Sequence, residues 1–416
     1  MTGTKSDVRE TAVCRYCGSA DLLPLLSLGE QPPSNSFLSE RDLASERRYP
    51  LDVVLCRTCF LMQLGHVLSP TLIFGNYLYL SSTSAALQQH YRHLARELSE
   101  RFALQPGDLV VDVGCNDGSL LREWDDRLVR VGVEPSQVSE IARQSGLDVI
   151  KAYFDAGLAE RIARAHGTAA LVTATNVFPH VDDIDGFTSG LRSLVGSTGT
   201  LVIEASYLPD LIDQCLFDTI YHEHLAYLSL TSLVPFLSRH GLHIVDAQRV
   251  AVGASGPAIR IFVTAAESRH AVDGSVQRLL ADEARWGIRR VENYTAFADR
   301  VANARSRLLT FIADLRSRGA RVGGYGAPAK GNTLLNYLGL DRDTIEMIAE
   351  TNPLKLGLVT PGTHIPIVSE DRFLEEMPEY ALLLSWNYVD YFLEHSDYIR
   401  RGGKFIVPLP EPTIRP

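Results

Sequence analysis

The sequence predicts an α/β protein of three parts, a small metal-binding domain followed by two Rossmann-like domains. Two observations predict the large parts: a strand-like run that ends in a glycine turn and leads into a helix occurs at Val110–Leu121 and again at Arg321–Asn332. A third observation, two Cys-x-x-Cys pairs near the N-terminus, predicts the small part. We expect boundaries at residues 1–79, 80–266 and 267–416.

Composition excludes several classes of function. The chain has 416 residues and a formal net charge of -10, so binding to nucleic acid is not expected. It contains no apolar run of the about 20 residues that a membrane-spanning helix needs. The segment Met1–Glu10 is polar and lacks the apolar core of a signal peptide. We therefore expect a cytoplasmic protein without a membrane partner, and nothing in the sequence argues against a monomer.

The two cysteine pairs predict a zinc site. Cys14 and Cys17 form the first pair, and Cys56 and Cys59 form the second. Four thiolates complete a tetrahedral structural zinc site and leave no position open for a reacting water. Redox pairs or disulfides are the alternatives, and the expected cytoplasmic location disfavours them. Between the pairs, Leu28–Pro33 indicates a turn.

A segment rich in tyrosine and serine follows the second pair. It contains Tyr77, Tyr79 and Ser82 and leads into a helix predicted over Ala85–Phe102. The serines of the segment suit the helix N-cap, and the same side chains suit a lid that faces a substrate. The sequence alone leaves the two interpretations even.

The central part alternates strands and helices, as an α/β domain does. Helices are predicted at Gln137–Gly146 and Leu158–Ala165. Strands are predicted at Leu109–Val113, Arg130–Glu134, Ala170–Ala174, Gly199–Glu204, Ile244–Arg249 and Ala258–Thr264.

The first glycine turn favours S-adenosylmethionine as the cofactor. Its spacing does not match the dinucleotide fingerprint, and Glu134 ends the next strand about 20 residues later, where a carboxylate suits a ribose. This pattern is typical of a class I S-adenosylmethionine methyltransferase, and an ordinary βαβ turn is the alternative. The other candidate cofactor residues lie in the turn or follow later strands: Asp112, Gly114, Asn116, Asp117, Gly118, Phe154 and Asn176.

The stretch Phe217–Leu225 has the densest set of chemical groups. It contains Tyr221, His222, Glu223 and His224. Histidine moves protons near neutral pH, and a neighbouring glutamate stabilises its charged form. We therefore expect acid–base work here, with a metal held by His-x-His or a structural polar turn as alternatives. His180 follows the strand predicted at Ala170–Ala174, at the edge of the sheet where ligands bind.

The last part repeats the strand, glycine turn and helix after a helical segment predicted over Ser268–Arg318. Backbone N–H groups at such a turn, with Lys330 beside them, favour a diphosphate. Further strands are predicted at Met347–Glu350, Tyr380–Leu384 and Lys404–Val407. A domain kept for packing alone is the alternative. Other candidate substrate residues lie in the turn or in loops after strands: Tyr325, Ala327, Asn332, His364, Trp386 and Asn387.

The ordered set of motifs resembles a known family. The cysteine pairs, then VDVGCNDGSLL, IYHEHLAYLS, GGYGAPAKGNTLLNY and TPGTHIP, cover nearly the whole chain. This order resembles the sugar C-methyltransferases of antibiotic pathways, which act on nucleotide-linked 4-keto-deoxysugars, usually at carbon 3 and in some members at carbon 5. The resemblance implies a zinc-binding domain, a methyltransferase domain and a C-terminal Rossmann-like domain that holds a dTDP-linked sugar.

The resemblance also implies roles for single residues. The family's Tyr-x-Glu-His falls on Tyr221, Glu223 and His224, with His222 in the variable place near the substrate. For the mechanism we expect His224, oriented by Glu223, to be the base that forms an enolate. His180 and Tyr221 would donate to the enolate oxygen, and a further tyrosine of the site falls on Tyr77 or Tyr79, with Tyr77 preferred.

One departure from the family concerns sugar recognition. Many relatives have His-Gly-Gly where this chain has Gly253, Ala254, Ser255 and Gly256, and the following Arg260 is retained as a substrate residue. Three other functions stay open. The first is methylation at carbon 5. The second is O- or N-methylation of a small natural product, which leaves the last domain without a purpose. The third is a non-enzymatic zinc adaptor, which leaves the Tyr-His-Glu-His cluster without a purpose.

Overall fold

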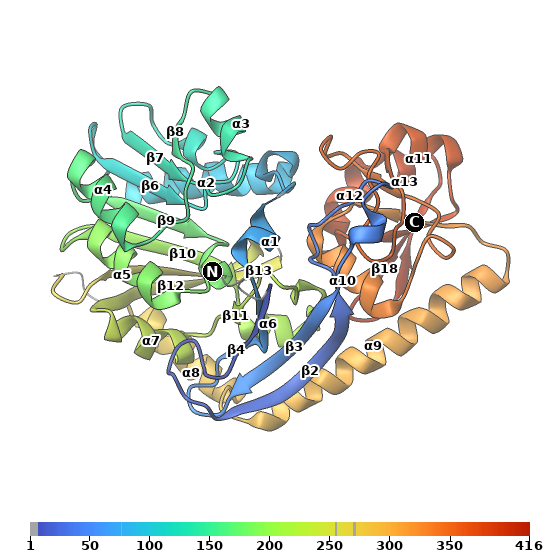
Figure 1. Cartoon of the computed structure of the whole chain (residues 1–416), viewed down its shortest axis with the longest axis horizontal. Helices are drawn as coiled ribbons and strands as arrows, with labels where there is room; N and C mark the ends of the chain where they lie inside the picture. Colours follow the sequence, from blue (N-terminus) through green and yellow to red (C-terminus); the bar gives the residue numbers. More distant parts are fainter. Residues whose placement is uncertain (1–6, 76, 254–255, 269–271) are drawn as a thin grey trace, which may run out of the picture.

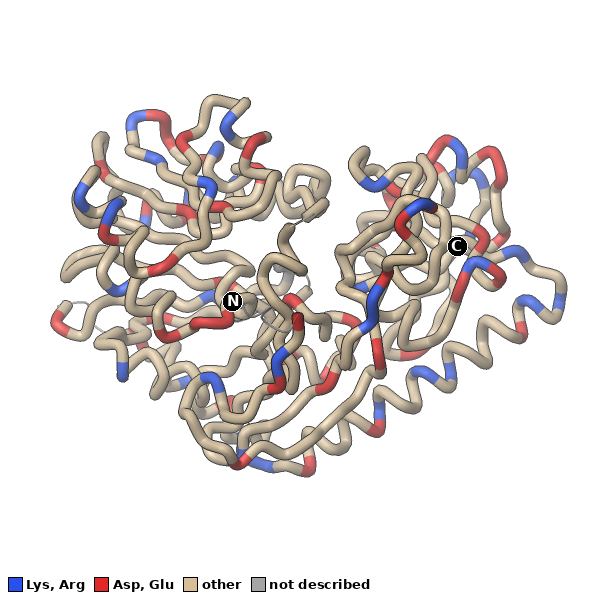
Figure 2. Tube along the Cα trace, in the orientation of Figure 1, with Lys and Arg blue, Asp and Glu red and all other residues tan. Residues whose placement is uncertain are grey.

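A computed structural model describes residues 7–75, 77–253, 256–268 and 272–416. Figure 1 shows two lobes, with the strands β2 and β3 and the long helix α9 running between them. Charged positions of both signs are spread over the outer loops and helices of both lobes (Figure 2). Within the described part of the chain, no helix is both long and apolar enough to span a membrane.

The first lobe contains a seven-stranded sheet in the order β12-β13-β10-β9-β6-β7-β8. The five strands from β8 to β10 are parallel, and β13 runs antiparallel between β10 and β12. The strands are β6 (Leu109–Val113), β7 (Val129–Val133), β8 (Asp148–Ile150), β9 (Leu171–Thr175), β10 (Thr200–Ser206), β12 (Leu242–Gly253) and β13 (Gly256–Ala265). The helices are α2 (Ala85–Arg101), α3 (Ser139–Gln144), α4 (Ala156–His166), α5 (Ile184–Val195), α6 (Leu208–Asp213) and α7 (Leu230–Arg239).

Apolar runs in the sequence form the central strands of this sheet. Every residue of β6 and of β9 is buried, as expected of parallel strands that are covered on both faces. Each of the six predicted strands is present within a few residues of its expected bounds. The short β8 has no predicted bounds, because three residues with an exposed first position carry little periodic signal. Ala254 and Ser255, part of the departure from the family, lie outside the described residues.

The N-terminal domain is built on an antiparallel sheet in the order β11-β4-β3-β2. The turn expected over Leu28–Pro33 is wrong for its first half, because β2 continues to Gln31 through a bulge with Gly29 at a φ of 79°. The elements are β1 (Val8–Glu10), β2 (Leu22–Gln31), β3 (Tyr49–Cys56), β4 (Met62–Leu64), β5 (His66–Leu68), α1 (Pro70–Phe74) and β11 (Ala226–Tyr227).

The second lobe contains a six-stranded sheet in the order β16-β15-β14-β17-β18-β19, parallel except for β19. Two helices precede it, so the predicted helical segment is interrupted at 287–290, and residues 269–271 of that segment lie outside the described chain. The strands are β14 (Val322–Tyr325), β15 (Ile348–Glu350), β16 (Ile367–Ser369), β17 (Tyr380–Leu383), β18 (Lys404–Val407) and β19 (Thr413–Arg415). The helix α8 (Gly274–Trp286) packs against β12 and α7 of the first lobe. The other helices are α9 (Val291–Ser317), α10 (Ala329–Leu338), α11 (Glu370–Glu376), α12 (Val389–His395) and α13 (Asp397–Arg400).

The three parts share one apolar core. A single cluster of buried side chains contains Leu51 of the N-terminal sheet, Phe217 of the central loop, Phe297 of α9 and Leu335 of α10. The strand β11 belongs to the N-terminal sheet although it follows the central loop, and the Leu64 N–H donates to the Leu225 carbonyl at 3.1 Å. The fold therefore places the loop Phe217–Leu225 where all three parts meet.

Candidate functional site

The four cysteines lie together and fit a zinc ion. All four Sγ atoms lie within 4.8 Å of one another, with Cys14 and Cys59 at 3.4 Å and Cys17 and Cys56 at 3.5 Å. Zinc–sulfur bonds of about 2.3 Å in a tetrahedron put the sulfurs about 3.8 Å apart, so the cluster needs little adjustment to bind the ion.

This cluster is attached to the first lobe. Tyr16, inside the first cysteine pair, stacks on Phe236 of α7 with ring centroids 4.4 Å apart. Its carbonyl accepts from the Arg239 guanidinium, and Arg15 pairs with Asp182 at 3.2 Å. These contacts dock the first cysteine pair on the first lobe, which fits the structural role predicted for the zinc site.

The rings of three predicted catalytic residues lie together. The centroids of Tyr221 and His224 are 4.0 Å apart, and those of His180 and His224 are 4.9 Å apart. The Thr219 carbonyl lies 2.7 Å from His224 Nδ1, and because a carbonyl only accepts, Nδ1 carries the proton. His224 Nε2 is therefore the nitrogen with a free lone pair, and it belongs to a ring in contact with two potential donors.

Burial controls the charge of both histidines. It lowers the pKa of His224 to about 4, against a raising effect from the Thr219 carbonyl. It lowers the pKa of His180 well below the ordinary value, with a further lowering by His224. His180 Nε2 is buried and has no hydrogen-bond partner among the residues the structure describes. Both rings are neutral at pH 7, so one can accept a proton while the other donates a hydrogen bond.

Glu223 has a different environment from the one expected. The carbonyl of Thr219, rather than Glu223, orients His224. The Glu223 carboxylate instead accepts from Asn35 Nδ2 at 2.7 Å, so its partner comes from the N-terminal domain. Burial raises the pKa of Glu223 to about 7, and the hydrogen bonds from Asn35 and Tyr77 oppose that rise. This carboxyl group is poised to change charge near neutral pH.

The segment Tyr77–Ser82, which we name the strap, connects three elements through its own backbone. Three successive carbonyls accept side-chain amides: Tyr77 from Gln137 at 2.9 Å, Leu78 from Asn352 at 2.9 Å, and Tyr79 from Asn116 at 3.1 Å. Gln137 and Asn116 belong to the first lobe, and Asn352 belongs to the second lobe. The strap therefore ties the first glycine turn to the second lobe and places the Tyr77 side chain beside Glu223.

Side chains of the first glycine turn also hold the strap. Asn116 Oδ1 accepts from the Ser81 N–H at 2.9 Å, and Asp117 Oδ2 accepts from the Ser82 N–H at 2.9 Å. The side chains predicted to bind cofactor at 116 and 117 are therefore occupied by the strap, and the exposed Ser82 contributes its backbone to that contact. Like the glycines at 114 and 118, Asn116 has a positive φ.

Glu134 lies where a ribose-binding carboxylate is expected. One of its oxygens accepts from the Asn116 N–H at 3.2 Å and the other from the Ser136 N–H at 2.9 Å. Gly114 is required by packing as well as by its turn, because a Cβ there would lie 2.9 Å from Val177. Carboxylate oxygens keep further lone pairs after one N–H each, so Glu134 can still accept from ribose hydroxyls.

The remaining cofactor candidates take several positions. Asp112 is buried and accepts from Thr173 Oγ1 at 2.7 Å, and burial raises its pKa to about 7. Phe154 packs edge-to-face on Phe187 at 5.3 Å in the core of the lobe, whereas the neighbouring Tyr153 is half-exposed. Asn176 has a positive φ and its N–H donates to the Glu204 carbonyl.

Three predicted substrate residues of the last domain form a cluster with the central loop. Lys330 Nζ donates to Asn387 Oδ1 at 2.5 Å and lies 4.5 Å from the centre of the Trp386 ring. Asp218 accepts from Trp386 Nε1 at 2.7 Å and lies 4.0 Å from Lys330 Nζ. Burial lowers the pKa of Lys330 to about 8, and Asp218 opposes this. Asp218 is five residues before Glu223, so this cluster adjoins the histidine site.

The second glycine turn repeats the arrangement of the first. Glu350 ends β15 as Glu134 ends the second strand of the other sheet, and it accepts from the Ala327 N–H at 2.9 Å. It also accepts from the N–H groups of residues 351 and 352. Lys355 Nζ donates to the Ala327 carbonyl at 2.8 Å and lies 3.8 Å from Glu350. The Ala327 backbone is thus engaged at the turn by the buried Lys355 and the partly buried Glu350.

Four predicted substrate residues have other structural partners. Tyr325 is part of an aromatic cluster, and its hydroxyl donates to Glu370. His364 lies 2.8 Å from Glu46 and joins the C-terminal lobe to the N-terminal domain. Arg260 is buried in the first lobe, where its guanidinium donates to Glu204 and Glu97 at 2.8 and 2.9 Å. His222 Nε2 lies 3.3 Å from the Pro50 carbonyl, toward the N-terminal sheet.

Sequence reasoning missed several residues of the site. Glu350 could have been found, because it stands roughly as far past its glycine turn as Glu134 does. Asp218 lies inside the stretch already singled out but received no role. Asn35 and Asn352 lie in loops of ordinary composition, and no local pattern marks them. Lys355 is buried although lysine is usually exposed, which only the fold can show.

The chain matches three family models that together cover most of its length. They are described as "Putative zinc binding domain" over residues 14–74, "Methyltransferase domain" over residues 87–247, and "C-methyltransferase C-terminal domain" over residues 253–410. Their order follows the three parts of the fold described above.

A curated relative extends the similarity to the whole chain. The C-methyltransferase NovU of Streptomyces niveus is 38% identical over 413 residues, which cover 98% of this chain and 97% of that protein. Among solved structures, an S-adenosylmethionine-dependent methyltransferase of Clostridium acetobutylicum matches 43% of this chain and 92% of its own, at 14% identity and a TM-score of 0.34. Magnesium protoporphyrin IX methyltransferase of Synechocystis with bound S-adenosylmethionine matches 42% and 78%, at 16% identity and a TM-score of 0.31.

Proposed function

Because the chain belongs to the C-methyltransferase family and uses S-adenosylmethionine, we propose that it methylates carbon 3 of a dTDP-linked 4-keto-deoxysugar. The observation that carries the proposal is the free Nε2 of His224, which a hydrogen bond to Thr219 orients among Tyr221 and His180. A site with a neutral base and two donors suits formation of an enolate next to a ketone.

The proposed chemistry begins with removal of a proton from the carbon beside the ketone. His224 Nε2 takes this proton, and the electron pair of the broken C–H bond moves toward the 4-keto oxygen. Negative charge then grows on that oxygen, where His180 and Tyr221 donate hydrogen bonds. S-adenosylmethionine supplies, when bound, a methyl group that its sulfonium already activates. The protein therefore has to remove one proton, stabilise one oxyanion and hold two reactants in line.

The pKa of His224 favours a neutral base over a charged one. Burial lowers this pKa to about 4, so the ring is unprotonated at pH 7 and ready to accept. The imidazolium that forms is costly in a buried site unless a negative charge appears near it. The enolate is such a charge, which ties proton transfer to the stabilisation of the oxyanion.

The positions of the two ligands follow from the two glycine turns. Glu134 suits the ribose of the cofactor in the first lobe. Lys330, Trp386 and Asn387 suit the diphosphate and base of the sugar nucleotide in the second lobe, with Asp218 linking them to the histidine loop. The buried Lys330 keeps a proton at pH 7, because its lowered pKa of about 8 is still above that pH.

A turnover assay tests the proposal. The enzyme is given S-adenosylmethionine and a freshly made dTDP-4-keto-6-deoxysugar in deuterated water, and the products are analysed by mass spectrometry and proton NMR. We expect the mass of one methyl group and a new quaternary centre at carbon 3. A methyl group at carbon 5 would assign the methylation to that carbon instead. Methylation of oxygen or nitrogen, or of a small natural product alone, would refute the sugar C-methylation.

A further inference from the structure

We propose that Asn35, a residue of the zinc-binding domain, recognises a hydroxyl or amino group of the sugar through its Oδ1 while its Nδ2 holds Glu223. This inference rests on the proposed sugar substrate and assigns it a recognition residue. Asn35 is 5% exposed, and it lies in the first part of the loop between β2 and β3, where residues 32–35 are all buried. Loops normally run over the surface, so a buried polar loop needs a function or a strong structural reason.

Contacts to the C-terminal lobe hold this loop from one side. The Ser34 carbonyl accepts from Asn332 Nδ2 at 2.7 Å, and Ser34 Oγ lies 3.1 Å from Thr333 Oγ1. Pro32 and Pro33 restrict the backbone before it, and a turn bond joins the Ser36 N–H to the Pro33 carbonyl at 3.0 Å. Asn35 is therefore fixed before any ligand arrives, as a recognition residue should be.

The bond to Glu223 fixes which way the amide faces. Glu223 Oε1 accepts from Asn35 Nδ2 at 2.7 Å, so the NH₂ end of the amide faces the carboxyl group. Asn35 Oδ1 then faces away from Glu223. This oxygen is buried and has no hydrogen-bond partner in the described part of the chain. A buried acceptor without a donor is costly, so we infer that a ligand supplies the donor.

Two neighbouring residues carry the same signal. Asn332 Oδ1 and Asp218 Oδ1 are also buried acceptors without a partner among the described residues. Asn332 contacts the Asn35 loop, and Asp218 lies on the loop that carries Glu223. Three unpaired acceptors favour a ligand with several O–H or N–H donors. A sugar has such donors, whereas an ionised phosphate has none. The contact between Asn35 and the catalytic loop puts its donor on the sugar rather than on the nucleobase.

The test compares Asn35→Ala, Asn35→Asp and the control Asn293→Ala, which removes a half-buried amide on α9. The measurements are kcat and KM for the keto sugar nucleotide, Kd for dTDP and for S-adenosylmethionine, and Tm. We expect Asn35→Ala to lower kcat/KM between about tenfold and a hundredfold, the cost of one hydrogen bond near charged groups. The two Kd values should stay unchanged, and Asn293→Ala should leave kcat/KM unchanged.

The pH profile and a substrate analogue separate recognition from folding. Asn35→Asp keeps an acceptor but puts a second carboxylate beside Glu223, which raises the pKa of the pair and should move the inflection of the pH–rate profile upward. A sugar that lacks the recognised group should be a poor substrate for the wild type and no worse than the full sugar for Asn35→Ala. Should Asn35→Ala fail to fold, the nearly isosteric Asn35→Asp carries the test.

Several outcomes would overturn the assignment. Equal loss of dTDP affinity in Asn35→Ala would place the contact on the nucleobase, and a fall in Tm that accounts for the lost activity would make Asn35 structural only. An unmoved pH profile in Asn35→Asp would separate it from Glu223. A wild-type enzyme inactive on every keto sugar would refute the proposed function first, before any variant is measured, and the assignment of Asn35 with it.

Discussion

Glu223 and His224 are neighbours in the chain, and the fold favours the neutral form of both side chains. For Glu223 the neutral form is the protonated one, and for His224 it is the unprotonated one. Burial lowers the pKa of His224 to about 4 and raises that of Glu223 to about 7. A buried carboxyl group whose pKa lies near neutrality costs stability whenever it is charged. We therefore expect the site to be less stable than its surroundings, a common consequence of function.

Replacing Glu223 by glutamine should reveal this cost. The folded pKa of about 7 lies above the ordinary 4.5, so the wild type loses stability as pH rises from 4.5 through 7. The glutamine side chain stays neutral and keeps an acceptor for Asn35, so Glu223→Gln should be more stable at pH 8 by up to about 3 kcal/mol. Urea unfolding at pH 4.5 and pH 8 measures the difference. Equal gains at both pH values would contradict the raised pKa.

At the scale of secondary elements and their connections, the strap joins the two proposed ligand sites. The two sheets bring these sites near each other, and the strap links them by hydrogen bonds. Its carbonyls at 77, 78 and 79 each accept an amide from a different element. The Asn352 contact is the one that crosses to the C-terminal lobe, and Asn352 itself is held at the second glycine turn through Glu350. A ligand bound at the second glycine turn is thereby connected, through Glu350 and Asn352, to the strap that lies over the first glycine turn.

Removing this crossing contact should loosen the strap. Asn352→Ala leaves the Leu78 carbonyl without its donor, so amide hydrogen exchange over the strap should become faster, while the protection of β6 and β14 stays the same. Hydrogen exchange followed by mass spectrometry gives the measurement, with Asn293→Ala as the matched control. Unchanged protection of the strap would show that the contacts from Gln137 and Asn116 hold it alone.

The sequence predicted best those elements whose apolar residues follow a single clear pattern. The α/β fold class and its zinc-binding N-terminal part are confirmed, and β6 and β18 have the expected bounds. The three-residue strands β8 and β16 have no predicted bounds, because each is only partly buried and too short to show a period. The turn predicted over Leu28–Pro33 was wrong at Gly29, because pairing of β2 with β3 makes that residue part of a bulge.

At the scale of the whole molecule, the zinc ion and the shared core decide whether the site exists. The cysteine cluster docks through Tyr16 on α7, and the same domain carries Asn35 into the junction. Chelation of the metal should lower Tm, and activity should fall in proportion to the folded fraction, because structural zinc contributes folding free energy. Thermal melts and rates with increasing chelator test this. A metal-free enzyme that stays folded but inactive would contradict a purely structural zinc.

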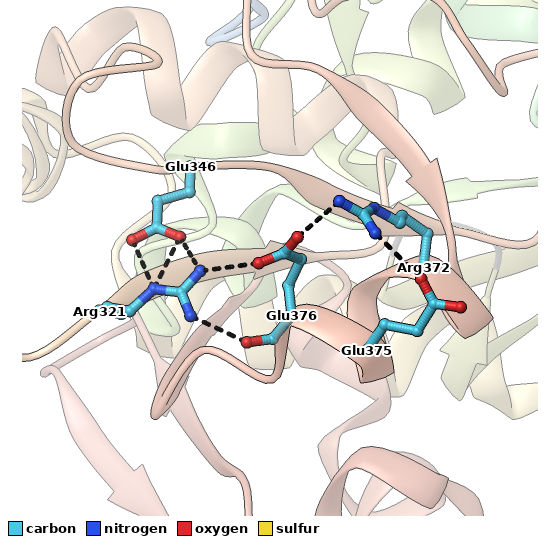
Figure 3. Close-up of polar contacts among 5 residues, drawn as sticks. All are labelled: Arg321, Glu346, Arg372, Glu375 and Glu376. Atoms are coloured by element: carbon cyan, nitrogen blue, oxygen red, sulfur yellow. Dashed lines mark hydrogen bonds and ion pairs between the residues drawn. The ribbon is translucent and has the colours of Figure 1, made fainter.

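A surface network of the C-terminal lobe should prove unrelated to function. Figure 3 shows Arg321 between Glu346 and Glu376, and Arg372 between Glu376 and Glu375. Arg321 precedes β14, at the edge of the sheet opposite the glycine turn, and its side chain is 45% exposed. Arg321→Ala should cost less than about 1 kcal/mol of stability. Kinetic constants should not change, and a changed KM would show that the network reaches the site.

The candidate site was only partly predictable for a physical reason. Motifs report residues whose chemistry depends on near neighbours in the chain, such as the cysteine pairs, Glu134 or His224. Asn35, Asp218 and Lys355 gain their roles from contacts between parts of the molecule far apart in sequence, and so does the burial of Arg260 between two carboxylates. Only the assembled molecule shows which predicted substrate residues face the junction and which join domains.

The most direct test of the central claim separates proton removal from methyl transfer. The enzyme is incubated with S-adenosylhomocysteine and the keto sugar nucleotide in deuterated water, and deuterium at carbon 3 is followed by proton NMR. We predict that the wild type exchanges this hydrogen, and that His224→Ala slows the exchange by about 10² to 10⁴, the usual contribution of a general base. Affinity for S-adenosylmethionine should remain, measured by calorimetry. Exchange in His224→Ala at the wild-type rate would contradict the account.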